Sequence, residues 1–115
     1  MKRRCVLGRR TVAGVTGYGQ FCPMSKALEV LGQRWALLVV RELLCGSSRF
    51  NDIRRGMPTC PPATLTKRLR ELERAGVVSR TEDASGVTYR LTSAGAELAP
   101  IVDDLAVWGQ RWVRS

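Results

Sequence analysis

The sequence predicts a mainly α-helical domain that carries one small β-hairpin, an α+β arrangement. Apolar residues recur at helical spacing over residues 23–75 and again over 92–112. Between them lie two short strand-like runs, at 77–81 and 87–91, joined by a polar linker. A chain of 115 residues can bury a core of its own, so these elements fit one domain.

The first helix is expected to start at Pro23, because a proline at the first helical position loses no hydrogen bond. Its apolar residues keep helical spacing as far as Gly32, which ends it. A second helix is expected over 34–45, and Gly46 stops it. This second segment is apolar on nearly all sides, which is typical of a helix buried at the centre of a domain.

A short third helix is expected over 49–55, with Phe50 and Ile53 facing inward. A turn rich in glycine and proline follows, and a fourth helix covers 62–75. The fourth helix has two contrasting faces. Its apolar stripe is Leu65, Leu69 and Leu72, and its opposite face carries Ala63, Thr66, Lys67, Arg70 and Arg74.

After the two strands and their loop at 82–86, Thr92 is expected to cap a single last helix that Pro100 kinks. This helix carries a long apolar stripe that a chain of this length can hardly cover by itself. We expect the stripe to form a dimer interface, and the alternative is packing against the first helix. Its residues are Leu98, Ile101, Val102, Leu105, Trp108 and Trp112.

The composition favours a polyanionic partner and excludes several functions. The net charge is +9, from 19 Lys and Arg against 10 Asp and Glu, which suits DNA, RNA or an anionic membrane surface. No apolar run is long enough to span a membrane. The chain has no histidine, and its four cysteines form no CxxC pair. We therefore expect no enzyme activity, no metal and no cofactor.

Two regions are expected to differ in order. Residues 1–20 hold five basic residues, four glycines and no acidic residue, so we expect a flexible cationic arm there. This arm is not a signal peptide, because arginines and glycines break its apolar runs. Residues 21–115 form the folded domain, and the cysteine pattern indicates the reducing cytoplasm.

The order of a short helix, a tight turn, a basic amphipathic helix and a hairpin is the layout of a winged helix-turn-helix. In this layout the fourth helix enters the DNA major groove and the hairpin, or wing, contacts the flanking backbone. Thr66, Lys67 and Arg70 are expected to face bases. Ala63, Thr64 and Ser85 complete the predicted contact surface, and the predicted phosphate contacts are Arg49, Arg68, Arg80 and Arg90. The alternative is a solvated charged face and an ordinary surface hairpin.

Cys22 is a candidate redox sensor. It precedes Pro23 at the N-cap of the first helix, where the helix dipole and free N–H groups stabilise a thiolate. Lys26 lies one turn away. Thiolates are the form that reacts with oxidants and electrophiles. The alternative is a small packing residue, and Cys45 and Cys60 are interpreted as structural.

Several motifs follow one another in a fixed order between Phe21 and Trp112. They are Cys22-Pro23, 31–35 with Leu37-Leu38, Arg41-Glu42-Leu43, Gly46 with 49–54, 65–73 with Gly76, 89–92 with Gly95, and Trp108-Gly109. In this combination the sequence resembles the HxlR-type transcriptional regulators, a subgroup of bacterial winged helix-turn-helix proteins. The resemblance implies a homodimer formed by the first and last helices, with Met24 and Leu28 in its interface, that binds an inverted-repeat operator. In this family the cysteine that matches Cys22 is often a sensor of oxidants, quinones or aldehydes.

Relatives often begin the recognition helix with Ser-Pro, whereas this chain has Cys60-Pro61-Pro62. The usual hydroxyl N-cap is missing, which costs about 1 kcal/mol of helix stability. We expect a repressor rather than an activator. The rival hypotheses are a regulator that responds to a small aromatic effector bound near Phe21 and Trp35, and a non-specific binder that uses charge alone.

Overall fold

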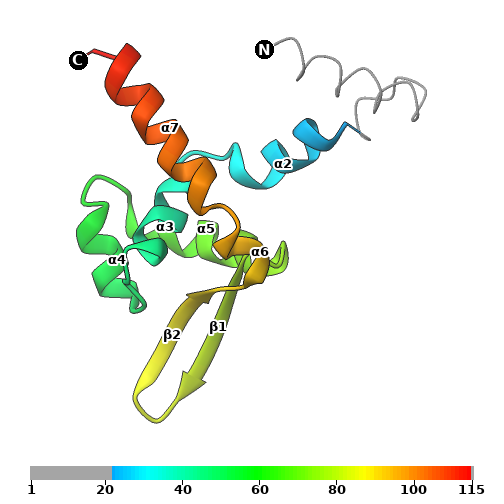
Figure 1. Ribbon diagram of the computed structural model, residues 1–115. Helices are drawn as coiled ribbons and strands as arrows, with labels where there is room; N and C mark the ends of the chain where they lie inside the picture. The colour runs from blue at the N-terminus through cyan, green and yellow to red at the C-terminus, as the bar shows by residue number, and fades with distance from the viewer. Residues whose placement is uncertain (1–21, 115) are drawn as a thin grey trace. The chain divides into compact units, whose positions relative to one another are not determined.

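The computed structural model of the chain describes residues 22–114 (Figure 1). The described residues divide into two units, one within Met1–Gln33 and the other within Arg34–Ser115. The cationic arm predicted for residues 1–20 lies outside the described residues, as does Phe21.

In the first unit, helix α2 spans Pro23–Leu31, in agreement with the sequence prediction. Cys22 is its N-cap residue, and the Gly32 amide closes its last turn on the Leu28 carbonyl at 2.8 Å. Met24 and Leu28 are both exposed, at 65% and 48%. The predicted interface residues therefore lie on an exposed face of this helix.

The second unit is built around three helices, α3 (Ala36–Leu44), α4 (Phe50–Gly56) and α5 (Pro62–Arg74). Helix α3 contacts α4, α5 and strand β2, so it occupies the central place that its apolar sequence predicted. Not every apolar residue of this helix is buried, however, because Leu38 is 37% exposed. Phe50, predicted to face inward, is only half-buried. The buried core residues of the three helices are Ala36, Val39, Val40, Leu43, Ile53, Leu65, Leu69 and Leu72.

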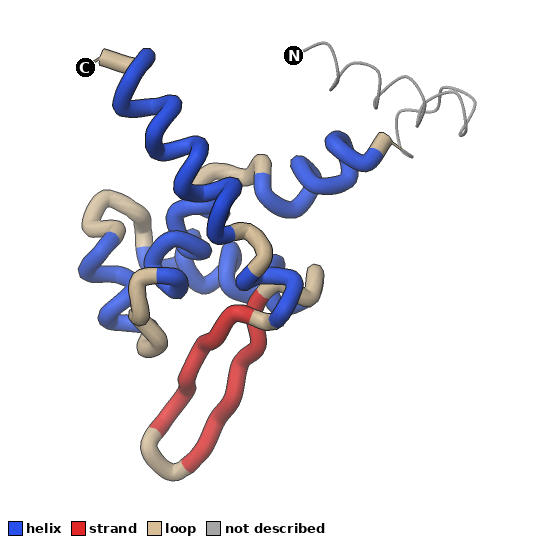
Figure 2. The backbone as a smooth tube through the Cα atoms, in the orientation of Figure 1, coloured by secondary structure: helices blue, strands red, loops and turns tan. Residues whose placement is uncertain are grey.

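Strands β1 (Val78–Asp83) and β2 (Gly86–Leu91) form an antiparallel hairpin that projects from the helices (Figure 2). The register pairs Val78 with Leu91 and Asp83 with Gly86. The hairpin is longer than predicted, because residues 82, 83 and 86 belong to the strands and only 84 and 85 form the turn. Gly86 has a φ of +117°, a backbone angle that residues with a Cβ rarely adopt.

The single last helix predicted from the sequence is in fact two helices, α6 (Ser93–Ala96) and α7 (Ala99–Trp112). Thr92 caps α6 as predicted, since its hydroxyl accepts from the Gly95 amide at 3.2 Å. Pro100 lies in the first turn of α7 and does not kink a continuous helix. A proline has no N–H to donate to the preceding turn, but it fits in the first turn of a helix. One helix therefore ends before Pro100 and a new one begins.

Within residues 22–114, no helix has the length and apolar character needed to cross a bilayer.

Gly95 is a position where the close packing of α6 on the base of the hairpin can be tested. A Cβ added there would collide with the Val77 carbonyl oxygen and lie 2.9 Å from Leu91 Cδ2. We expect Gly95→Ala to lower the free energy of unfolding by about 1–3 kcal/mol, measured by urea unfolding. The exposed neighbour gives the control, because Ser93→Ala should change it by less than about 0.5 kcal/mol. Equal stabilities would contradict this packing.

Candidate nucleic-acid interface

Helix α5 presents one apolar and one polar face, and its apolar face fixes its orientation. Leu65, Leu69 and Leu72 are each at most 1% exposed. Burying a leucine stabilises a fold by about 1.5–3 kcal/mol, so rotating the helix would be costly. Lys67 and Arg70 are exposed on the other side. The hydrophobic core therefore holds the predicted reading face toward solvent.

The N-terminus of α5 lacks a side-chain cap. Pro61 is the N-cap residue and accepts no hydrogen bond through its side chain, as the Cys60-Pro61-Pro62 sequence predicts. Cys60 is 3% exposed, and burial raises the pKa of its thiol, against the opposing charges of Arg68 and Arg34. These features make Cys60 a packing residue.

The predicted base-facing residues differ in exposure. Ala63, Lys67 and Arg70 are exposed, whereas Thr64 and Thr66 are half-buried. The Thr66 hydroxyl donates to the Pro62 carbonyl at 3.1 Å. Since its hydrogen is used in this bond, Thr66 can offer only its methyl group and an acceptor lone pair to a ligand.

Arg68, predicted to contact phosphate, is largely engaged within the protein. Its side chain is 12% exposed. Nε donates to the Arg34 carbonyl at 2.7 Å, and Nη1 donates to Glu71 at 3.1 Å. The first bond connects α5 to the segment that precedes α3, and the second lies within α5. Together they leave one guanidinium nitrogen for a phosphate.

Trp35 and Arg34 form an unusual start to α3. Trp35 is the N-cap residue and has a φ of +80°, in the left-handed region. For a bulky residue this conformation costs roughly 1–2 kcal/mol. The Arg34 guanidinium lies 4.9 Å from the centre of the Trp35 ring, a cation–π distance. Both residues line a hollow of about 330 Å³ together with Thr59, Pro61, Thr64 and Arg68.

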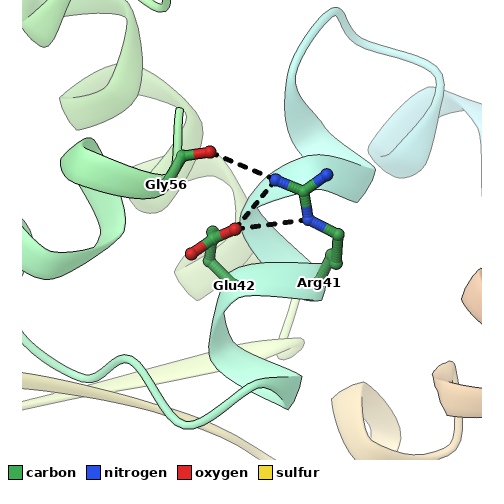
Figure 3. Close-up of polar contacts among 3 residues, drawn as sticks. All are labelled: Arg41, Glu42 and Gly56. Atoms are coloured by element: carbon green, nitrogen blue, oxygen red, sulfur yellow. Dashed lines mark hydrogen bonds and ion pairs between the residues drawn. The ribbon is translucent and has the colours of Figure 1, made fainter. Parts of the chain in front are cut away.

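An ion-pair cluster connects α3 to the C-terminal end of α4 (Figure 3). The Arg41 guanidinium donates to Glu42 at 2.8 and 3.2 Å and to the Gly56 carbonyl at 3.2 Å. A Cβ at position 56 would collide with the Glu42 carboxylate. The glycine therefore allows the close approach that sets the position of α4 before the turn into α5.

The wing carries the remaining predicted contacts. Arg90 is exposed on β2. Arg80 lies opposite Tyr89 in the register, and a hydrogen bond to that hydroxyl, together with nearby acidic groups, raises the pKa of its guanidinium. Arg80 also lies 3.5 Å from Glu82. Arg80 therefore stays positively charged.

Arg49, another predicted phosphate contact, reaches from the N-cap of α4 to the wing turn. Its Nη1 donates to the Ser85 and Val87 carbonyls at 3.1 and 3.2 Å, and its Nη2 donates to the Ser85 hydroxyl at 3.1 Å. Ser85, itself a predicted DNA contact, also donates to Asp83 through its amide at 2.8 Å and its hydroxyl at 2.6 Å. These bonds, with Arg49 nearby, lower the pKa of Asp83.

Three further basic residues near these elements were not predicted as DNA contacts from the sequence. Arg54 and Arg55, both exposed, line a hollow of about 400 Å³ on α4 with Asn51 and Pro58. Arg34 lies beside the N-terminal end of α5. The adjacent arginines at 54 and 55 could have been recognised in the sequence as a basic cluster, whereas the position of Arg34 depends on tertiary contacts.

Cys22 and the α7 stripe, the remaining predicted sites, lie outside α5 and the wing. In the first unit, the polar groups of Ser25, and then the Met24 amide, lower the pKa of the Cys22 thiol, although its side chain forms no capping hydrogen bond. In the second unit, Ile101, Leu105, Trp108 and Trp112 of α7 are 49–66% exposed. Leu98 and Val102 are half-buried. An apolar hollow of about 240 Å³ lies between α3 and α7, lined by Leu37, Leu38, Arg41, Val102, Leu105 and Ala106.

Comparison with known proteins places the chain in a family. Residues 30–115 match the HxlR-like helix-turn-helix model. The transcriptional regulator YvaP of Bacillus subtilis is 39% identical over 98 residues, which cover 82% of this chain and 91% of YvaP. The reduced regulator YodB of B. subtilis has a TM-score of 0.68 at 30% identity, covering 81% of this chain and 95% of YodB.

The redox regulator HypR, in its reduced form, has a TM-score of 0.70 at 36% identity, covering 77% of this chain and 91% of HypR. The fold is the winged helix-turn-helix predicted from the sequence, and the relatives are regulators of transcription rather than enzymes. The chain belongs to the HxlR-like helix-turn-helix family of transcriptional regulators.

Proposed function

We propose that this protein is a cytoplasmic repressor that binds an inverted-repeat DNA operator as a homodimer. The observation that carries the proposal is the orientation of α5, whose three leucines are buried while Lys67 and Arg70 are exposed. The helix also contacts strand β1 of the wing. Such a helix can enter a major groove while the wing reaches the flanking backbone. The charge of +9 supports binding to a polyanion.

Each residue of the interface has a distinct role in this proposal. Lys67 and Arg70 donate to base edges, with guanine as the preferred partner of both. Thr66 contacts a thymine methyl group or accepts from an exocyclic amine, because its hydroxyl hydrogen is held by Pro62. Ala63 and Thr64 allow close approach at the start of α5. The phosphate contacts are Arg80, Arg90 and the free nitrogen of Arg68, and we add Arg34 to these.

The dimer is proposed to form through the apolar stripe of α7, with Met24 and Leu28 of α2. The exposure of two tryptophans on one helix supports this, since large contiguous apolar surfaces mark interaction sites. A dimer also suits an inverted repeat, whose half-sites lie roughly 34 Å apart on one side of the duplex.

Cys22 is proposed to be the sensor of an oxidant or electrophile. The lowered pKa of its thiol and its place at the start of α2 support this role. Among the related proteins, YodB has been solved in diamide-treated and quinone-bound forms and HypR in an oxidised form.

A small aromatic effector without cysteine chemistry is the alternative. The apolar hollow between α3 and α7 supports it, because its volume of about 240 Å³ suits a single ring and Arg41 lies at its edge.

Selection of bound duplexes from a random-sequence library tests the proposal directly. A specific regulator enriches an inverted repeat, whereas a protein that binds through charge alone enriches nothing. Expression from a reporter that carries the enriched repeat then gives the sign of regulation.

Arg70→Ala should weaken binding to the enriched duplex by about 1–3 kcal/mol, because a base contact is lost. Binding to unrelated DNA should change little. Arg90→Ala should weaken binding to all duplexes alike and lower the slope of log K against log salt concentration by about 1. Fluorescence anisotropy over a salt series measures both effects. Arg114→Ala, which removes the same charge beyond α7, is the control. Unchanged operator affinity in Arg70→Ala would place the reading face elsewhere.

Leu105→Glu should convert the dimer into a monomer, because it places a charge in the proposed apolar interface. The side chain is 49% exposed in the single chain, so folding should be preserved. Sedimentation velocity measures the change. Gln110→Glu adds the same charge on the opposite side of α7 and should leave the dimer intact. A dimer that persists in Leu105→Glu would move the interface off this stripe.

Cys22→Ser should preserve DNA binding but abolish its response to diamide or quinone. Cys45→Ser, at an exposed cysteine, should respond as the wild type does. Because its pKa is lowered, the Cys22 thiol should also alkylate faster than the Cys60 thiol, whose pKa is raised, between about pH 6 and 8. Iodoacetamide labelling followed by mass spectrometry measures these rates. A full response in Cys22→Ser would exclude this cysteine and favour the aromatic effector.

A further inference from the structure

We propose that Arg49 is a positioning residue, which holds the wing against the helix-turn-helix, rather than a phosphate contact. This inference rests on the proposed DNA-binding function. It starts from the three hydrogen bonds that the Arg49 guanidinium donates to the wing turn, to the Ser85 carbonyl, the Val87 carbonyl and the Ser85 hydroxyl, at 3.1–3.2 Å.

The backbone of the wing turn directs two carbonyl groups at the Arg49 guanidinium. The two carbonyls that bond to Nη1 flank Gly86, whose φ is +117°. A Cβ at position 86 would lie 3.0 Å from Nη1, so a larger residue would crowd the guanidinium. Glycine at this position therefore permits both the backbone conformation of the turn and the close approach of Arg49.

The turn is also held from its other side. Asp83 accepts two hydrogen bonds from Ser85, through its amide and its hydroxyl. The Ser85 hydroxyl donates to Asp83 while it accepts from Arg49, so the three side chains form a chain of charge-assisted bonds. Asp83 carries the negative charge that balances Arg49 at the wing tip.

A second connection lies further along the wing. The Tyr89 amide donates to the Ser48 carbonyl at 2.8 Å, one residue before Arg49. Residues 48 and 49, which lead into α4, therefore hold β2 at two positions along the strand, Val87 and Tyr89. An isolated two-stranded hairpin is marginally stable in water, so these connections give the wing a fixed direction.

The fixed direction matters for binding. Three bonds use two of the guanidinium nitrogens and direct them at the wing turn. A wing that is already ordered loses less conformational entropy when DNA binds. Arg49 thus contributes to affinity through the position of the wing, while Arg90 contributes through its own charge.

The test compares Arg49→Lys, Arg49→Ala and Arg90→Ala. A lysine keeps the positive charge but cannot reproduce the planar set of bonds. In the free protein, both Arg49 variants should exchange the amide hydrogens of residues 82–89 about three- to tenfold faster. Arg90→Ala should leave that exchange unchanged. Ser85→Ala removes one of the three Arg49 bonds and the hydroxyl bond to Asp83, but it keeps both carbonyl acceptors of Arg49, so it should give a smaller acceleration.

Binding to the enriched duplex provides the second measurement. Both Arg49 variants should bind about three- to tenfold more weakly, with the wild-type salt slope. Two outcomes would overturn the proposal. One is that Arg49→Ala exchanges its wing amides at the wild-type rate. The other is that Arg49→Lys binds with near-wild-type affinity while Arg49→Ala has a lower salt slope, which would make Arg49 a phosphate contact. The exchange measurement needs no DNA, so it judges the Arg49 contact even if no operator is enriched.

Discussion

Burial of the leucine stripe of α5 is the constraint on which the rest of the structure depends. Leu65, Leu69 and Leu72 fill the core against α3, and this contact decides which face of the helix meets solvent. The exposed Lys67 and Arg70 have their position only because the opposite side is fixed. The missing cap at Pro61 is tolerated for the same reason, since about 1 kcal/mol of lost capping is small beside three buried leucines.

The wing has no comparable core, and polar contacts take its place. Its outer residues are mostly exposed or half-buried, and only Val78 at its base is fully buried. Arg49 and Ser48 connect it to the start of α4, while Arg41 and Glu42 hold the end of that helix. Helix α4 is thus held at both ends, so it sets the position of the wing turn relative to the core.

The sequence predicted the helices and the two faces of α5 because helical periodicity and glycine or proline boundaries are local signals. It also predicted the missing cap of α5 and the Thr92 cap of α6. It missed the break before Pro100, because a proline fits both a kinked helix and a new first turn. Helical periodicity could not predict the contacts of Arg49 with the wing or of Arg68 with the Arg34 carbonyl, since these partners lie 34–38 residues away along the chain. A surface arginine and an arginine engaged in tertiary contacts look alike in a sequence.

These contacts also limit how binding could be regulated. Within one copy, α5 and the wing are both held to α3 and α4, so an effector that reshaped one of them would have to break several bonds or uncover the leucine core. In the proposed dimer, a change in how the two copies are held together requires neither. Binding to the proposed operator then depends on the separation of two recognition helices, which a rigid-body shift of one copy against the other alters. The exposed apolar stripe of α7 is therefore better placed than the reading face to control affinity in that dimer.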